Sequence, residues 1–150
     1  MKQNNNLLIL GAGELGHIAK EIAEAMGVFE KIDFLDDESE LAIGKLNEYE
    51  ELVVEYNYGF VAIGNPEIRM KWIEKLQADC YKLAILVSPK AYVAPSATLM
   101  KGTLVEANAT VNTLATVAVG SIISAGAVVN HNSFVGDGCH IDCNGVVEAH

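Results

Sequence analysis

Two histidines in the C-terminal part of the chain have the chemistry of acid–base catalysts. His131 lies in the segment Val129-Asn130-His131-Asn132, and His140 directly precedes Ile141. An imidazole titrates near neutral pH, so it can take a proton from an amine or a hydroxyl group as that group attacks an electrophile. Solvent-facing histidines without a catalytic role would look the same in the sequence. The two histidines alone therefore leave both interpretations open.

A glycine-rich segment near the N-terminus is a second candidate site. Gly11, Gly13 and Gly16 form a GxGxxG pattern between an apolar segment and an amphipathic one. Such glycines allow a tight turn and a close backbone approach, and the N-terminus of the following helix offers N–H groups to a phosphate. Asp36 and Asp37 end the next apolar segment, where a carboxylate can bind a ribose hydroxyl. A glycine turn that merely joins a strand to a helix is the alternative.

Further candidates belong to the same edge of the predicted sheet. His17 directly follows the last glycine, and Gly64-Asn65 ends the third apolar segment. His17 has the alternative of being a partly exposed surface histidine. Asn65 is most simply the N-cap of a helix that begins at Pro66, with a ligand contact as a secondary role.

The N-terminal half must position these residues, and it alternates between strand and helix patterns. We expect strands at 7–10, 32–35, 59–63 and 83–87, and helices at 14–26 and from Pro66 onward. Segment 42–58 is poorly periodic and has no assignment apart from a short strand or turn. The alternation predicts a small α/β domain in which helices flank a parallel, Rossmann-like sheet.

The C-terminal half repeats every six residues. Aliphatic residues recur at this spacing without a gap, at Val93, Leu99, Val105, Val111, Val117, Ile123, Val129, Val135, Ile141 and Val147. A small residue follows each of the first nine after four positions, as Ala97 follows Val93. This period is typical of a parallel β-helix with three short strands per coil, in which the aliphatic residue fills the interior and the small residue permits the corner.

These patterns divide the 150 residues into a domain at 1–88 and a β-helix of about three coils at 89–150. Fewer than about 90 residues before the β-helix are too few for a full dinucleotide fold, so a mononucleotide or nucleotide-sugar site fits better. The β-helix stops soon after Val147 without a capping segment, and we expect the chain to be cut short relative to a complete solenoid.

Composition excludes several classes of partner. A net charge of −10 argues against nucleic acid and against an anionic membrane surface. Neither a signal peptide nor a membrane span is recognisable, and three cysteines provide no disulfide framework, so a cytoplasmic protein is expected. Prism faces that carry Val, Ala and Thr but almost no charge predict a homotrimer with its β-helices side by side.

Five segments together resemble the sugar acetyltransferases of the NeuD/PglD type. They are GAGELGH (11–17), FLDD (34–37), AIGNPEIR (62–69), SPKAYVAPSAT (88–98) and VVNHNSFVGDGCHI (128–141). The resemblance implies a left-handed β-helix, acetyl-CoA as a co-substrate, a nucleotide sugar such as a UDP-amino sugar, and no permanently bound cofactor or metal. It implies His131 as the catalytic base, and His140 and Ala149 near the coenzyme. It also places the glycine loop, His17, Asp36, Asp37 and the Gly64-Asn65 turn against the nucleotide sugar.

The chain departs from this family in one residue of the predicted catalytic pair. Members usually carry an acidic residue directly after the catalytic histidine, where this chain has Asn132. Three functions follow from the sequence. The first is an acetyltransferase that acts on an amino or hydroxyl group of an activated sugar. The second is a non-catalytic trimeric module that binds a nucleotide sugar, and the third is a nicotinamide-dependent enzyme.

Overall fold

The computed structural model describes residues 3–149, so His150 lies outside the described residues. The chain forms two compact units, Met1–Ala84 and Ile85–His150. The boundary lies four residues before the expected one. Leu86 and Val87 already pair with Leu104 and Val105, so the first strand of the β-helix precedes Ser88.

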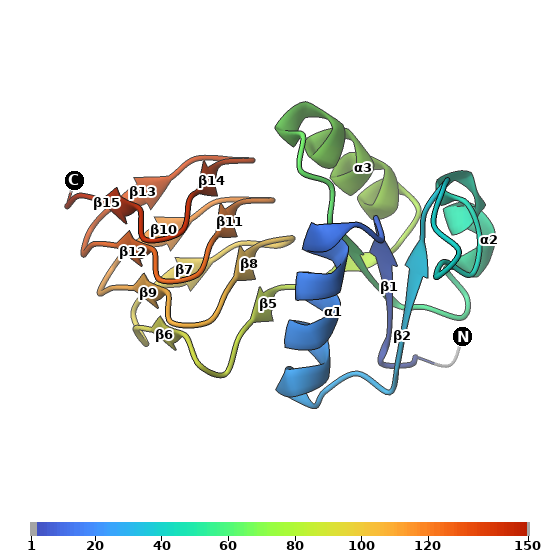
Figure 1. Cartoon of the computed structure of the whole chain (residues 1–150), viewed down its shortest axis with the longest axis horizontal. Coiled ribbons are helices and arrows are strands. Elements are labelled where there is room, and N and C mark those ends of the chain that lie inside the picture. Colours follow the sequence, from blue (N-terminus) through green and yellow to red (C-terminus); the bar gives the residue numbers. More distant parts are fainter. Residues whose placement is uncertain (1–2, 150) are drawn as a thin grey trace. The chain divides into compact units, whose positions relative to one another are not determined.

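The N-terminal unit is a four-stranded parallel sheet with strand order β2-β1-β3-β4 (Figure 1). Helix α1 packs against β1 and β2, and helix α3 packs against β3 and β4. The elements of this unit are β1 (Asn6–Leu10), α1 (Glu14–Met26), β2 (Lys31–Leu35), a 3-10 helix (Leu46–Glu48), α2 (Tyr49–Leu52), β3 (Tyr58–Val61), α3 (Pro66–Ala78) and β4 (Lys82–Leu83).

Local sequence explains these elements. Leu7, Leu8, Ile9 and Leu10 are all fully buried, as expected for a central parallel strand that is covered on both faces. Helix α1 has the predicted bounds and ends at Gly27, whose φ of 69° closes the last turn in the left-handed region. The segment that lacked a periodic pattern contains the 3-10 helix and α2, both too short to show one.

The predicted strand at 83–87 is wrong as a single element. Its first part, β4, pairs with β3 in the N-terminal sheet, whereas Leu86-Val87 forms β5 of the β-helix. The apolar run spans the join between the two units. Hydropathy alone does not separate the parts, because both bury aliphatic side chains.

The C-terminal unit is a parallel β-helix of three narrow sheets with strand orders β13-β10-β7, β14-β11-β8-β5 and β15-β12-β9-β6 (Figure 1). It has the left-handed fold that the sequence predicted. Its two-residue strands are β5 (Leu86–Val87), β6 (Tyr92–Val93), β7 (Thr98–Leu99), β8 (Leu104–Val105), β9 (Thr110–Val111), β10 (Thr116–Val117), β11 (Ile122–Ile123), β12 (Val128–Val129), β13 (Phe134–Val135), β14 (His140–Ile141) and β15 (Val146–Val147).

The predicted aliphatic series forms the interior of this prism. The buried core includes Val105, Val111, Val117, Ile123, Val129 and Val135, and the outer members of the series pack against it. Val87 and Ala91 also pack there, which extends the six-residue period one step further toward the N-terminus. That extension is the signal in the sequence that locates the true start of the β-helix.

The corners are made differently from the prediction. The small residues do not turn the chain, because several of them, such as Ala109, Ala115 and Ala127, belong to the buried core. The residue before each of the last eight small residues adopts a positive φ and makes the turn. These residues are Gly102, Asn108, Leu114, Gly120, Gly126, Asn132, Gly138 and Asn144. Glycine and asparagine are the residues that tolerate this conformation best.

Candidate functional site

The carboxyl ends of β1, β2 and β3 bring the glycine loop together with its neighbours. Gly11 N–H donates to the carbonyl of Leu35 at 2.8 Å. Gly11 has a φ of 106°, and a Cβ there would lie 2.5 Å from the carbonyl oxygen of Ala62. A Cβ on Gly16 would lie 2.1 Å from the carbonyl oxygen of Gly11. Gly11 and Gly16 are therefore required by packing, whether or not a ligand binds.

Gly13 differs from the other two glycines. It is exposed, it is the N-cap of α1, and a Cβ built on it meets no atom within 4 Å. The first intrahelical bond runs from His17 N–H to the Gly13 carbonyl, so the preceding N–H groups of the first turn point out of the helix. Packing does not explain a glycine here. An open N-terminus of this kind suits a phosphate group.

Asp36 holds the glycine loop in place. Its Oδ2 accepts from Ala12 N–H at 2.8 Å, and its Oδ1 accepts from the N–H groups of Glu38 and Ser39 at 2.8 and 3.0 Å. These bonds, with that from Ala12 the strongest, lower the pKa of the Asp36 carboxyl. Asp37 Oδ1 similarly accepts from Leu46 N–H. Both carboxylates thus have structural roles in the loops, and their contact with a ribose stays a prediction.

His17 and the Gly64-Asn65 turn lie at the same edge of the sheet. The exposed imidazole of His17 packs edge-on against Phe34, with ring centroids 5.4 Å apart. Asn65 is the N-cap of α3, because its Oδ1 accepts from Ile68 N–H at 3.0 Å. Gly64 and Asn65 are both exposed. The cap role of Asn65 is confirmed, and the ligand contacts of these residues stay predictions.

Arg69 is a site residue that the sequence analysis missed. Its side chain is fully buried, and its guanidinium donates to the carbonyls of Ile63 and Gly64 at 2.8 and 3.0 Å. These two hydrogen bonds hold the turn after β3 in place. A single arginine in the segment AIGNPEIR, on a helix with other charged residues, gave no sign that it would be buried.

His131 lies in the exposed corner between β12 and β13. Its Nδ1 is 3.1 Å from Asn132 Oδ1. An amide oxygen only accepts hydrogen bonds, so this contact favours the proton on Nδ1 and an unprotonated Nε2. Asn132 has a φ of 59°, one of the left-handed corner residues. Its identity therefore serves the turn as well as the imidazole.

His140 begins β14, on another side of the prism. Its exposed imidazole has Nε2 within 2.8 Å of Ser124 Oγ, a buried hydroxyl. Burial raises the pKa of the nearby Glu106 carboxyl, while its hydrogen bond with Ser124 and the charge of His140 act in the opposite direction. The sequence analysis did not identify Glu106 or Ser124. Their spacing of 18 residues, one full coil, was the available signal.

The two histidines do not lie together within one chain. They are nine positions apart in a coil of 18, which is half a circuit of the prism. His131 is at a corner, and His140 is on the opposite sheet, next to Ile122 of β11. Ala149 lies one coil beyond His131 in the same column. Within one chain the two histidines therefore lie on different sides of the β-helix, and the predicted contacts of His140 and Ala149 with the coenzyme stay predictions.

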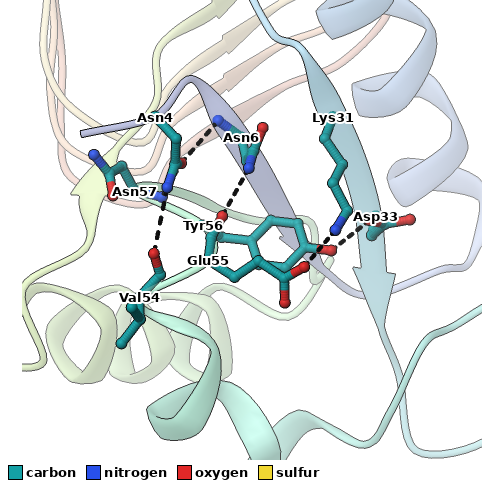
Figure 2. Close-up of polar contacts among 8 residues, drawn as sticks. All are labelled: Asn4, Asn6, Lys31, Asp33, Val54, Glu55, Tyr56 and Asn57. Atoms are coloured by element: carbon teal, nitrogen blue, oxygen red, sulfur yellow. Dashed lines mark hydrogen bonds and ion pairs between the residues drawn. The ribbon is translucent and has the colours of Figure 1, made fainter. Parts of the chain in front are cut away.

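A cavity of about 700 Å³ lies at the other end of the N-terminal sheet, away from the glycine loop. Its lining residues lie before or at the start of the strands, and they are Gln3, Asn4, Asn5, Asn6, Glu30, Val54 and Glu55. Figure 2 shows the polar contacts of these residues, in which Asn4 donates to the carbonyl of Val54 and Glu55 pairs with Lys31, a residue outside the lining, at 2.6 Å. These contacts join the start of β1 to the segment before β3. The cavity contains none of the predicted site residues.

Comparison with known proteins identifies the family. Residues 6–76 match the PglD N-terminal domain family. The acetyltransferase domain of PglB from Neisseria gonorrhoeae FA1090 is 33% identical with a TM-score of 0.90, and the match covers 93% of this chain and 72% of that chain. The chain belongs to the NeuD/PglD-type sugar acetyltransferase family.

Two ligand complexes of related proteins match as well. The same PglB domain in complex with acetyl coenzyme A has a TM-score of 0.88 at 33% identity, and the match covers 93% of this chain and 71% of that one. PerB from Caulobacter crescentus, in complex with CoA and GDP-perosamine, has a TM-score of 0.83 at 28% identity, over 91% of this chain and 68% of that one.

Membership of the NeuD/PglD-type family confirms the predicted fold class and makes the chain an acyltransferase by class. The matches extend over both units, so the family assignment replaces the nicotinamide-dependent alternative. Within residues 3–149, no helix is long and apolar enough to cross a bilayer. The cytoplasmic location stays a prediction.

Proposed function

We propose that this chain transfers an acetyl group from acetyl-CoA to an amino or hydroxyl group of a nucleotide-activated sugar. The observation that carries the proposal is the match, over both units, to an acetyltransferase domain that binds acetyl coenzyme A. The exposed His131, at a corner of the β-helix, supplies the base that such a reaction needs.

The hydrogen bond between His131 and Asn132 suits the base for this step. With Nδ1–H directed at Asn132 Oδ1, Nε2 carries no proton and takes the proton of the acceptor as it attacks the thioester carbon. Backbone N–H groups stabilise the tetrahedral oxyanion, and the imidazolium returns the proton as coenzyme A leaves as the thiol. Asn132 orients the ring but adds no negative charge, so it stabilises the imidazolium less than a carboxylate would.

The N-terminal unit is the proposed site for the nucleotide sugar. The open first turn of α1 at Gly13 receives a phosphate, and His17, Asp37 and the Gly64-Asn65 turn border it on the same edge of the sheet. The net charge of −10 makes this local arrangement of N–H groups more important, because the protein's overall field does not attract an anion. The expected ligand is a UDP-amino sugar, whereas PerB binds a GDP-sugar.

We further propose a homotrimer whose subunit contacts complete the site. Large apolar side chains are exposed on the β-helix, including Phe134 at 68% and Leu114 at 57%. Leu114 also has a φ of 58°, a strained conformation for leucine that suggests selection for a contact. His131 and His140 lie on different sides of one prism, so a ligand bound between two copies would contact His131 of one copy and His140 of the other.

The non-catalytic module remains the second candidate, and one experiment separates the two. Calorimetry measures binding of acetyl-CoA and of UDP- and GDP-amino sugars to the same preparation, and a thiol-release assay follows turnover. The enzyme binds both substrates and releases thiol only when the two are present together. Sugar binding without acetyl-CoA binding or thiol release would establish the module instead.

A further inference from the structure

The cavity at the amino-terminal edge of the N-terminal sheet has no role in the reaction proposed above. β1, β2 and β3 begin at this edge, at Asn6, Lys31 and Tyr58, whereas the glycine loop lies at their carboxyl ends. The cavity has a volume of about 700 Å³, which is within the range of small-molecule sites. All of its lining residues except Val54 are polar. The sheet therefore has a second space of ligand size, away from the predicted nucleotide-sugar site.

Hydrogen bonds hold the walls of this cavity in place (Figure 2). Asn4 Oδ1 accepts from the N–H groups of Asn6 and Asn57 at 3.1 and 3.0 Å. Asn4 Nδ2 donates to the carbonyl of Val54 at 3.3 Å, and the Asn6 amide donates to the carbonyl of Glu55 at 2.8 Å. These bonds tie the start of β1 to the segment before β3. The chain therefore forms the cavity without any help from a ligand.

Three lining side chains can bond to a ligand without breaking a contact of the fold. Gln3, Asn5 and Glu30 are exposed, and within residues 3–149 their side chains form no hydrogen bond or ion pair. The backbone of two of them is fixed, because Glu30 N–H donates to the Asn5 carbonyl at 3.0 Å. Each side-chain amide offers two N–H donors and a carbonyl acceptor, and the carboxylate offers two acceptor oxygens. Donors and acceptors thus border the same cavity.

The charges at the cavity disfavour an anionic ligand. Glu55 is paired with Lys31 at 2.6 Å, whereas the carboxylate of Glu30 has no cationic partner within residues 3–149. The net charge of −10 acts in the same direction. An apolar ligand does not fit either, because it would remove water from polar groups without replacing their hydrogen bonds. Val54, which is 63% exposed, is the one apolar side chain among the described lining residues.

We propose that this cavity binds an uncharged sugar ring, at a site separate from that of the nucleotide sugar. Each hydroxyl group of a sugar both donates and accepts, so neighbouring hydroxyls can bond to an amide and to a carboxylate at once. Gln3, Asn5 and Glu30 supply these partners, and the exposed Val54 side chain suits the C–H groups of the ring. The inference does not depend on the proposed function, because it concerns only the N-terminal unit.

NMR titrations of the full chain test the site. Glucose, galactose and N-acetylglucosamine are each added to the nitrogen-15-labelled chain, and the side-chain amide signals of Gln3 and Asn5 are identified by their loss in Gln3→Ala and Asn5→Ala. We expect at least one sugar to shift these signals in a saturable way, with a Kd of about 1–10 mM for a ligand held by a few neutral hydrogen bonds. No saturable shift with any of the three sugars overturns the proposal.

Two asparagine variants separate contact with the ligand from an effect on folding. Asn5→Ala removes an amide that makes no bond within residues 3–149, so it should weaken sugar binding about 2- to 10-fold, the scale of one hydrogen bond, and leave Tm unchanged. Asn4→Ala is the matched control, because it removes an amide with three bonds to the backbone and should lower Tm. Unchanged sugar affinity in Asn5→Ala overturns the proposal.

Two further measurements test the charge and the location. Glucose 6-phosphate carries the same ring as glucose with an anionic group, and it should bind more weakly at these amides, with a smaller difference in Glu30→Gln. Equal binding of glucose and its phosphate in the unsubstituted chain would contradict the assignment to an uncharged ligand. Gly13→Val should leave the sugar titration unchanged, since Gly13 is at the other end of the sheet. Loss of the shifts in this variant would move the sugar to the nucleotide-sugar site and overturn the proposal.

Discussion

Substitution of Gly13 should separate ligand binding from stability. Gly13 has φ and ψ of −84° and −157°, an extended conformation that any residue adopts, and the space for a Cβ is empty. Replacing this glycine by alanine reduces the entropy of the unfolded chain, which adds about 0.4–1 kcal/mol to stability. The loss of a glycine N-cap offsets this by a similar amount. The net change should therefore lie within about 0.5 kcal/mol, or about 1–2 °C in Tm.

Binding should respond much more strongly. A side chain at the first turn of α1 occupies the space where a phosphate approaches the N–H groups. One lost hydrogen bond to a charged group costs about 1.5–3 kcal/mol, which is about 10- to 150-fold in Kd. We expect Gly13→Ala to weaken nucleotide-sugar binding by at least this range, and Gly13→Val to abolish it. Isothermal titration calorimetry and thermal unfolding on the same samples measure both quantities.

Gly16→Ala is the matched control. Its Cβ would lie 2.1 Å from the Gly11 carbonyl oxygen, so the helix or the loop must move. Overpacking of this kind costs about 1–3 kcal/mol or more, and Tm should fall. The reasoning is refuted if Gly13→Val binds the nucleotide sugar normally, or if Gly13→Ala and Gly16→Ala lower Tm equally. Either result would make Gly13 a structural turn like its neighbours.

Three other predictions concern catalysis, pH dependence and assembly. His131→Ala should lower kcat by about 10²–10⁴-fold with little change in substrate affinity, and Asn132→Asp should keep or raise activity, as steady-state kinetics would show. Full activity in His131→Ala would make His140 the next candidate for the base. Because the folded state lowers the pKa of Asp36, its contribution to stability is present above the unfolded value of about 3.9 and is lost as pH falls through the folded value. The Tm difference between the unsubstituted chain and Asp36→Asn should accordingly be constant at neutral pH and shrink below about pH 4, and a difference independent of pH would count against this role. Leu114→Asn relieves a strained backbone but removes an exposed apolar side chain, so a trimer contact at this corner predicts a mass that falls toward the monomer in light scattering. A higher Tm with an unchanged mass would mean that the corner at Leu114 takes no part in a contact between subunits.

The repetitive half of the chain could be predicted closely from the sequence. A six-residue period repeats the same local environment many times, so each aliphatic position independently indicates an inward side chain, and Val105 through Val135 are indeed core residues. Helix α1 was equally clear, because its apolar spacing and the closing Gly27 are local signals. The repeat and helix α1 depend only on residues that are close in sequence, so the sequence alone is enough to predict them.

The roles of the polar residues were decided by the tertiary structure. The sequence predicts Asp36 as a ribose ligand, but it gave no sign that the Asp36 carboxylate accepts from Ala12 N–H, 24 positions away, and stabilises the loop. Arg69 can be buried because two carbonyls of the turn after β3, those of Ile63 and Gly64, accept from its guanidinium. A hydrogen bond between distant residues needs only a match in three dimensions, which no local pattern encodes.

The placement of the histidines shows the same division. The sequence determined that His131 and His140 lie on the same coil, since the coil length follows from the repeat. Only the path of the chain around the prism put one at a corner and the other on the opposite sheet, beside Ser124. Periodicity defines the environment that each residue shares with its equivalents. The directions in which non-equivalent residues point depend on how the strands close into three sheets, and that closure is a property of the folded chain.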